Sequence, residues 1–248
     1  MTLAQTLGLP KHLDSNPLLA RWLRVRRDGV VEARVGKVEL GQGILTALGQ
    51  VVADELGVHP RQVRMLPANT ATGPDQDLTA GSMSVVDSGP ALRVACANLR
   101  SLFAAEAARR WHVPVAQVSV VKGVFTGPRA GLALGYGDLT DAVDLAVPAD
   151  ASVTTTAPED GHWVGTSAPR IDLPDKIAGL PRFIHDIRLP GQLFGRVVRP
   201  PSPGARLVDL DRADFGDASV EVVRDGSFLG VVGADEAHVT RAVARGRA

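Results

Sequence analysis

The chain has 248 residues, enough for one large or two modest domains with a hydrophobic core. Its 27 Lys and Arg residues balance its 27 Asp and Glu residues, so the composition does not favour nucleic acid or an anionic membrane surface as a partner. Cys96 is the one cysteine, which excludes an intrachain disulfide and a cysteine-ligated zinc or iron–sulfur centre. We expect Cys96 to be a small core residue.

No stretch of the sequence reaches the roughly 20 apolar residues of a membrane span. Residues Met1 to Pro17 lack the charged start, the apolar run and the cleavage site of a secretory signal peptide. We therefore expect a cytoplasmic protein without a membrane span, and export together with a partner stays open.

After a polar lead, the first part of the chain predicts strands and a helix. Apolar residues alternate with polar ones from Trp22 to Leu40, and Asp28-Gly29 between two such runs predicts a hairpin turn. Apolar residues at helical spacing predict a helix over 44–56. Residues 62–66 predict a further strand.

A long loop and a second helix follow. Residues 67–90 are rich in Thr, Ala, Gly, Asp and Pro, and long ordered loops of this kind are often functional. Pro90 suits the first turn of a helix that Ser88 caps and that runs to about Trp111. Residues 118–121 predict a strand after it.

The second half of the chain has a different composition. Gly, Ala, Asp, Pro and Thr dominate the region after residue 125, where residues 136–143 are the one short helix expected. Later, prolines separate strands expected at 183–187, 193–198, 220–223 and 228–232, before a helix at 235–245. We predict a mixed α/β (α+β) fold divided into a lead at 1–20, a first domain at 21–125, a linker at 126–164 and a second domain at 165–248.

Gly41-Gln42-Gly43 lies between a predicted strand and a predicted helix. Two glycines let the backbone approach a ligand, and a helix start offers N–H groups and a positive dipole end to an anion. The dinucleotide-binding fingerprint needs a third glycine, where Thr46 stands here. The glycines also suit a plain tight turn. Gln42 favours the ligand, because a glutamine between two glycines has no packing role and its amide both donates and accepts.

The segment Thr79-Ala80-Gly81-Ser82-Met83-Ser84 is the second motif. Small residues and hydroxyls in a row allow N–H and O–H groups to converge on phosphate oxygens, although such residues also cluster in ordinary turns. Both motifs precede a helix in one domain. Together they favour a phosphate-bearing ligand held between two helix N-termini.

Several short segments match one family in combination. They are residues 36–43 (GKVELGQG), 53–58 (ADELGV), 69–70 before Pro74, and 79–84 (TAGSMS) with Gly89. In this combination the chain resembles the molybdopterin-binding large subunit of the xanthine oxidase/aldehyde oxidase family. Residues 181–201 and 224–232 resemble the "hammerhead" domain of that family. The order of the two regions resembles the permuted type of large subunit found in nicotinate dehydrogenase and in isoquinoline 1-oxidoreductase.

The resemblance implies a molybdenum–molybdopterin cofactor, in its cytosine dinucleotide form, that hydroxylates an aldehyde or an N-heterocycle. It also implies a [2Fe–2S] centre on a separate small subunit, since this chain lacks the cysteines for one. The first domain is then a molybdopterin-binding subdomain and the second a hammerhead-like domain, whose completeness stays open. The implied cofactor-binding residues form two walls, Gly41, Gln42 and Gly43 in one and Gly81, Ser82, Met83 and Ser84 in the other.

The family's catalytic base is a late glutamate, and no residue here matches it. Glu39 and Glu55 belong to the cofactor-region motif and the helix after it, and His185 is interpreted as structural. We therefore expect no catalytic residue and no protein ligand to a metal in this chain. Its expected partners are the rest of the large subunit and the small [2Fe–2S] subunit, and the chain alone should be inactive.

Two other functions stay open from the sequence. The chain could be a truncated or split fragment that acts as a non-catalytic scaffold, since the resemblance covers only the first part of a large subunit. It could also be a nucleotide-binding α/β protein of another family, an interpretation that depends on Gly41–Gly43 alone.

Overall fold

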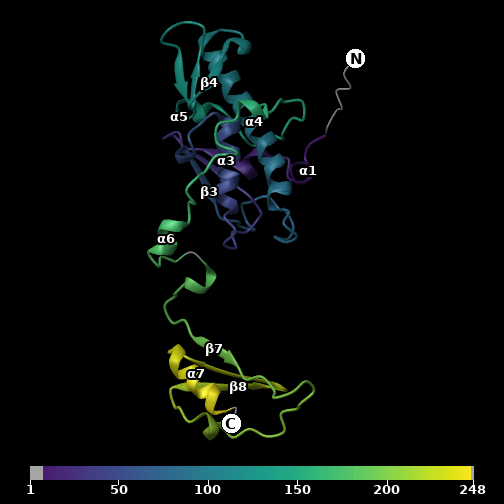
Figure 1. Cartoon of the computed structure of the whole chain (residues 1–248), viewed down its shortest axis with the longest axis vertical. Helices are drawn as coiled ribbons and strands as arrows, with labels where there is room; N and C mark the ends of the chain where they lie inside the picture. Colours follow the sequence, from purple (N-terminus) through teal and green to yellow (C-terminus); the bar gives the residue numbers. More distant parts are fainter. Residues whose placement is uncertain (1–7, 182, 247–248) are drawn as a thin grey trace. The chain divides into compact units, whose positions relative to one another are not determined.

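The computed structural model describes residues 8–181 and 183–246 (Figure 1). Contacts within the chain separate it into two compact units, with the division between Pro174 and Asp175. Both units combine helices with β-strands, as the sequence predicts. Each unit has a hydrophobic core of its own.

The first sheet of unit 1 begins with the predicted hairpin. Strand β1 (Leu23–Val25) pairs antiparallel with β2 (Val31–Arg34), and the turn between them contains Gly29 at φ +80°. Strand β3 (Val63–Leu66) then pairs parallel with β2. β2 ends at Arg34 rather than at Leu40, because the following residues form bonds to a distant loop instead of to a neighbouring strand.

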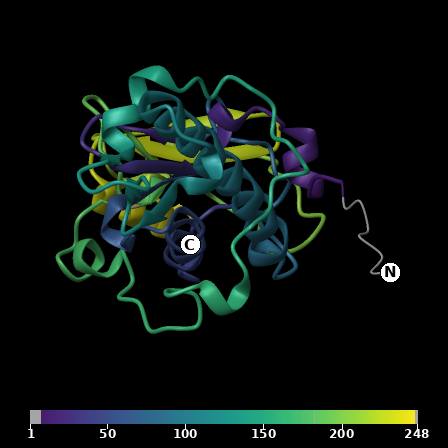
Figure 2. The same cartoon turned by 90° about the horizontal axis from the view of Figure 1, so that it is seen from above.

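Two helices pack against each other beside this sheet, as Figures 1 and 2 show. Helix α3 (Ile44–Leu56) has the predicted bounds and ends at Gly57, whose φ is +63°. Helix α4 (Ser84–Trp111) begins six residues before Pro90, so Pro90 lies inside it. Ser88 is therefore no cap: it is buried in the helix, and its hydroxyl donates to Gln76 Oε1 at 3.0 Å.

A second three-stranded sheet follows the C-terminal end of α4. Its antiparallel strands are β4 (Ser119–Val121), β5 (Val124–Thr126) and β6 (Ala133–Gly135), followed by helix α5 (Tyr136–Leu139). Phe103, Phe125 and Tyr136 pack their rings together there. The Tyr136 hydroxyl donates to Leu56 O at 3.0 Å, and burial raises the pKa of this phenol.

The core of unit 1 contains side chains from both sheets and both long helices. Trp22 and Cys96 are fully buried in it, which confirms the structural interpretation of the cysteine. No helix among the described residues is long and apolar enough to span a membrane. The shorter elements are α1 (Lys11–Ser15), α2 (Leu19–Trp22), η1 (Pro60–Gln62), η2 (Val115–Gln117), η3 (Thr140–Ala142), η4 (Pro158–Asp160) and α6 (Leu173–Ile177), which crosses the boundary between the units.

The segment 126–164 differs from the predicted linker, because it is part of unit 1. Its isolated apolar residues, such as Val147 and Trp163, pack against the core. Its backbone bonds to the helices: Val147 O accepts from Leu19 N at 3.0 Å, and Asp150 O accepts from the Asn98 side chain at 3.1 Å. A polar composition resembles a linker, but here the polar groups find partners on the folded domain.

Unit 2 consists of one antiparallel sheet and one helix. The strand order is β7 (Phe194–Val197), β9 (Phe228–Gly233) and β8 (Val220–Asp225), and α7 (Glu236–Arg245) begins after Asp235, whose side chain caps it. The 3₁₀-helix η6 (Arg212–Phe215) adds Phe215 to the core. These elements agree with the predicted strands and helix of the second domain.

One predicted strand of unit 2 is wrong. Residues 183–187 contain the 3₁₀-helix η5 (Ile184–Asp186) instead. The Asp186 carboxylate accepts the backbone N–H of Phe183 at 2.9 Å, a local bond that stabilises the turn. His185 lies in this exposed turn.

We expect limited proteolysis to cut first between residues 175 and 193, not within 126–164. The side chains of Ile177 and Ile184 are 84% and 79% exposed, whereas 126–164 is bonded to the core. A protease of broad specificity is required, since Arg129 is the one tryptic site in 126–164. Mass spectrometry of the earliest fragments measures the result, and first cuts inside 126–164 would restore the linker interpretation.

Candidate functional site

The loop before helix α3 is shaped by Glu39. Gly41 and Gly43 have φ of +104° and +84°, a backbone conformation that glycine adopts without strain. One carboxylate oxygen of Glu39 accepts the N–H groups of Gly41 and Gly43, each at 2.9 Å. The other oxygen accepts Leu45 N at 3.3 Å. A carboxylate of the chain itself therefore occupies the N-terminus of α3.

This arrangement corrects two expectations about the first motif. The start of α3 does not offer the N–H groups of Gly43 and Leu45 to an external anion, because Glu39 already binds them. The Gln42 side chain has a local role: its Oε1 accepts from Leu40 N at 2.5 Å and its Nε2 donates to Val38 O at 2.9 Å. The glutamine thus stabilises the loop on which it lies.

The second motif forms the start of helix α4. Gly81 and Ser82 are both left-handed, with φ of +63° and +59°, and both are exposed. Met83 is the N-cap residue, and its side chain makes no capping bond within the described part of the chain. Ser84 is the first helical residue. A 28-residue helix therefore presents the N–H groups of its first turn without a side-chain cap, beside two serine hydroxyls.

Tertiary contacts bring the two motifs together. Val38 N donates to the Thr79 hydroxyl at 2.9 Å, which ties the segment before Gly41 to the segment before Gly81. Gly36 allows the close approach, since a Cβ there would lie 2.5 Å from Pro74 O. The structure thus joins two segments about 40 residues apart in sequence, as the two-wall interpretation requires.

Lys37 is the charged centre of this junction. It is buried, with 1% of its surface exposed, and its ammonium donates to Gln76 O at 2.6 Å and to Leu78 O at 2.8 Å. The same ammonium lies 2.8 Å from an oxygen of Asp87, in the first turns of α4. Lys37 holds the pKa of Asp87 below its usual range, and His12 Nε2 lies 3.5 Å from the other oxygen.

Gln76 links the segment before Gly41 to helix α4. Its side-chain oxygen accepts from Gly36 N at 2.8 Å and from the Ser88 hydroxyl at 3.0 Å. Its side-chain nitrogen is buried and has no hydrogen-bond partner among the described residues. Sequence reasoning assigned no role to Lys37, Gln76 or Asp87; the one available signal was that Lys37 belongs to the family segment 36–43, four residues before Gly41.

The acidic residues of helix α3 have structural partners. Glu55 is 1% exposed, and it pairs with Arg100 at 3.0 Å and accepts Thr156 N at 2.9 Å. Asp54 accepts backbone N–H groups of residues 162–164 at 2.7–2.8 Å. Both carboxylates therefore hold the segment 150–164 to the helix. No cluster of three or more His, Cys, Asp or Glu side chains suited to a metal occurs within residues 8–181 and 183–246.

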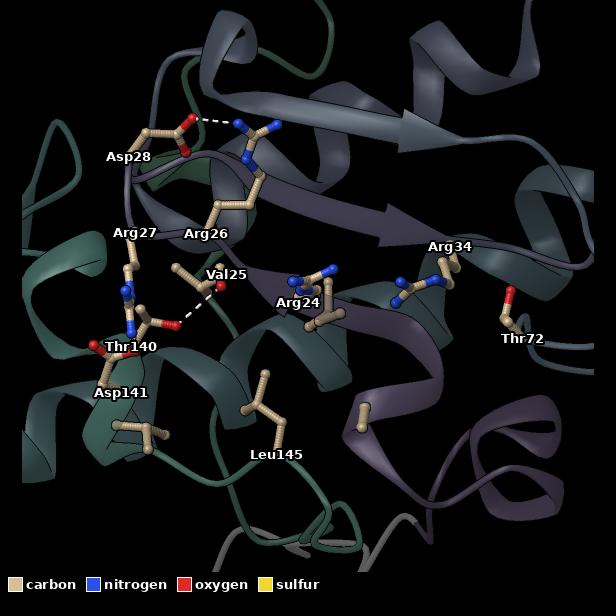
Figure 3. A pocket seen from close by; sticks show the side chains of 13 residues that line it. Arg24, Val25, Arg26, Arg27, Asp28, Arg34, Thr72, Thr140, Asp141 and Leu145 are labelled. Atoms are coloured by element: carbon tan, nitrogen blue, oxygen red, sulfur yellow. Dashed lines mark hydrogen bonds and ion pairs between the residues drawn. The ribbon is translucent and has the colours of Figure 1, made fainter.

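A hollow of about 1010 Å³ lies away from both motifs, on the side of strand β1 (Figure 3). Arg26 pairs with Asp28 at 2.7 Å. Arg27 pairs with Asp141 at 3.2 Å. Much of the positive charge that lines the hollow is thus neutralised locally, which does not favour an anion site. Its four arginines are Arg24, Arg26, Arg27 and Arg34.

Comparison with known families places this geometry in context. The model of the molybdopterin cofactor-binding domain matches residues 5–168, two thirds of the chain, and includes both motifs. The chain belongs to this family. The match continues through residues 126–164, in agreement with their packing in unit 1.

Characterised proteins show where such a domain occurs. The chain is 35% identical to one of the subunits of nicotinate dehydrogenase from Pseudomonas putida, over 90% of this chain and 20% of that protein. It is 31% identical to the beta subunit of isoquinoline 1-oxidoreductase from Brevundimonas diminuta, over 83% of this chain and 32% of that protein. A solved structure of reconstituted CO dehydrogenase from Oligotropha carboxidovorans aligns at a TM-score of 0.43 and 27% identity, covering 47% of this chain and 15% of that one.

Proposed function

We propose that this molybdopterin cofactor-binding domain holds the pyrophosphate of its cofactor at the start of helix α4. The observation that carries the proposal is the uncapped first turn of that helix, beside Ser82 and Ser84. N–H groups and hydroxyls are donors suited to phosphate oxygens, and the helix dipole favours negative charge there. The start of α3 is filled by Glu39, so α4 is the better anion site.

In this proposal each wall has a separate task. Gly81, Ser82, Met83 and Ser84 bind the pyrophosphate through backbone N–H groups and hydroxyls. Gly41, Gln42 and Gly43 form the opposite wall, which presents main chain to the pterin in a shape fixed by Glu39 and by the Gln42 amide. The bound cofactor supplies the redox chemistry, and the protein binds and orients it.

The proposed whole enzyme is a molybdenum hydroxylase. Its proposed substrate is an N-heterocycle, which relatives named for nicotinate and for isoquinoline favour, or an aldehyde. We propose the cytosine dinucleotide form of the cofactor, and electron transfer to a [2Fe–2S] centre on a separate small subunit. The function is that of part of a large subunit, located in the cytoplasm.

The rest of a large subunit is the proposed partner of this chain. The chain spans about a fifth and a third of the two relatives described above. Large apolar side chains that surround the two motifs are exposed, and contiguous exposed apolar surface marks an interaction site. They are Val38 at 44%, Leu40 at 68%, Leu78 at 81%, Met83 at 42%, Val85 at 54% and Val86 at 61%.

Replacing either serine by alanine tests the cofactor assignment. In the assembled enzyme, Ser82→Ala and Ser84→Ala should each weaken cofactor binding by about tenfold to a hundredfold, because each removes a hydrogen bond to a charged group worth about 1.5–3 kcal/mol. Molybdenum and pterin content per protein, measured after dialysis, reports the loss. Ser101→Ala is the matched control, since Ser101 is exposed further along the same helix. Unchanged content in both variants would refute the assignment.

A further inference from the structure

An arginine distant in sequence lies on the Gly41–Gly43 loop. Arg170 Nη1 donates to Gly41 O at 2.9 Å across 129 residues of chain. Its guanidinium also lies against Gly43, where a Cβ would be 3.5 Å from the guanidinium carbon. Arg170 follows residue 168, the last one that the family model matches, so the domain match does not include it.

The guanidinium is held in one orientation. Its Nε donates to Asp172 Oδ1 at 3.0 Å and its Nη2 to Asp172 Oδ2 at 2.7 Å, a bidentate pair. Asp172 is 5% exposed, so this anchor is largely shielded from water. Nη2 also lies 3.8 Å from the Glu39 oxygen that receives Gly41 N and Gly43 N. Arg170 thus faces the carboxylate that shapes the loop.

The next residue forms a second attachment. Ile171 N donates to the Thr46 hydroxyl at 3.1 Å, in the first turn of α3. Together, Arg170 and Ile171 connect to the loop at Gly41 and to the helix at Thr46. Two attachments on either side of Gly43 restrict the motion of the loop as a unit.

We propose that Arg170 is a positioning residue that clasps the Gly41–Gly43 loop and fixes the main chain it presents to the cofactor. Its purpose rests on the proposed function, but its effect on the loop does not. A lysine cannot replace it, because one ammonium cannot form the fork to Asp172 and reach Gly41 O at the same time.

Hydrogen exchange of the full 248-residue chain, followed by mass spectrometry, tests the clasp. In Arg170→Met and Arg170→Lys, the amides of Gly41, Gly43 and Leu45 should exchange about tenfold to a hundredfold faster. The reason is that the loop loses the hydrogen bond from the charged guanidinium to Gly41 O, so it opens more often. Exchange within residues 91–105 of α4 should not change. Arg129→Met is the control, since that arginine is exposed in the same unit. Unchanged exchange of the three amides would overturn the proposal.

Two further measurements separate possible causes. Asp172→Asn keeps the arginine but weakens its anchor, so it should speed exchange of the same amides even if Arg170→Met fails to fold. Faster exchange spread evenly over unit 1 would show only a loss of stability and would overturn the clasp. Cofactor content of the assembled Arg170→Lys enzyme then tests the proposed function separately: loosened amides with full cofactor content would keep the clasp and refute the role of this loop in binding.

Discussion

Replacement of Lys37 by methionine is expected to lower the free energy of unfolding of unit 1 by about 3–5 kcal/mol, the usual cost of removing one partner of a buried ion pair. The loss leaves the Asp87 carboxylate without its close cation and leaves the carbonyls of Gln76 and Leu78 without their donor. Methionine is unbranched like lysine and only one atom shorter, so it fills most of the same space and the effect of the lost charge dominates over that of a cavity. The same change separates the two motifs, because Lys37 bonds the segment before Gly41 to the start of α4.

Urea unfolding followed by tryptophan fluorescence measures this effect in unit 1 alone, because Trp22, Trp111 and Trp163 all precede residue 175. Lys11→Met is the matched control: that lysine is 77% exposed in its pair with Asp77, so its loss should cost less than about 1 kcal/mol. Equal costs for the two variants would contradict the assigned role of Lys37.

The cost at Lys37 should depend on pH. Lys37 lowers the pKa of Asp87 in the folded state, so the ion pair contributes its full stability above the pKa of an unfolded aspartate, about 3.9. That contribution is lost as the pH falls through the lower pKa of the folded state. The difference between wild type and Lys37→Met should therefore be constant at neutral pH and shrink in acid.

Replacement of Arg100 by methionine should have an effect of similar size, about 3–5 kcal/mol. Glu55 is 1% exposed, and Arg100 is its nearer cation at 3.0 Å. Arg100 also donates to Glu55 O, so its removal leaves a buried carboxylate and a backbone carbonyl undersatisfied. The segment that Glu55 holds at Thr156 should loosen at the same time.

Arg93 is a control within the same cluster. It lies 3.7 Å from Glu55 and its side chain is 37% exposed, so solvent screens the interaction. Arg93→Met should cost about 1 kcal/mol or less through this ion pair. A loss for Arg93→Met as large as for Arg100→Met, in the same fluorescence assay, would show that the cluster does not depend on the closer pair.

Local patterns in the sequence were sufficient for most regular elements. The helix over 44–56 and the hairpin at Asp28-Gly29 follow from apolar spacing and turn chemistry, which neighbouring residues determine. The strands of unit 2 follow from the same alternation. The family could also be recognised, because its combination of short segments is written directly in the sequence and the family match confirms it.

The tertiary structure decided the parts that depend on distant partners. Helix α4 begins at Ser84 rather than near Pro90. Its first turns are held by distant residues, since Lys37 pairs with Asp87 and Gln76 accepts from Ser88. The segment 126–164 belongs to unit 1 because its polar groups bond to helices far away in sequence, which composition does not reveal.

Only the tertiary structure showed that Glu39 binds the N–H groups at the start of α3. Glu39 stands four residues before Gly43, yet its sequence position does not tell whether its carboxylate turns toward the loop or toward solvent. Arg170 reaches the same loop across 129 residues. The sequence by itself determined which residues have the backbone freedom and the donor chemistry that the proposed cofactor site needs. Only the tertiary structure decided which of those donors are already bound within the chain, because a hydrogen bond depends on distances that chain order does not determine.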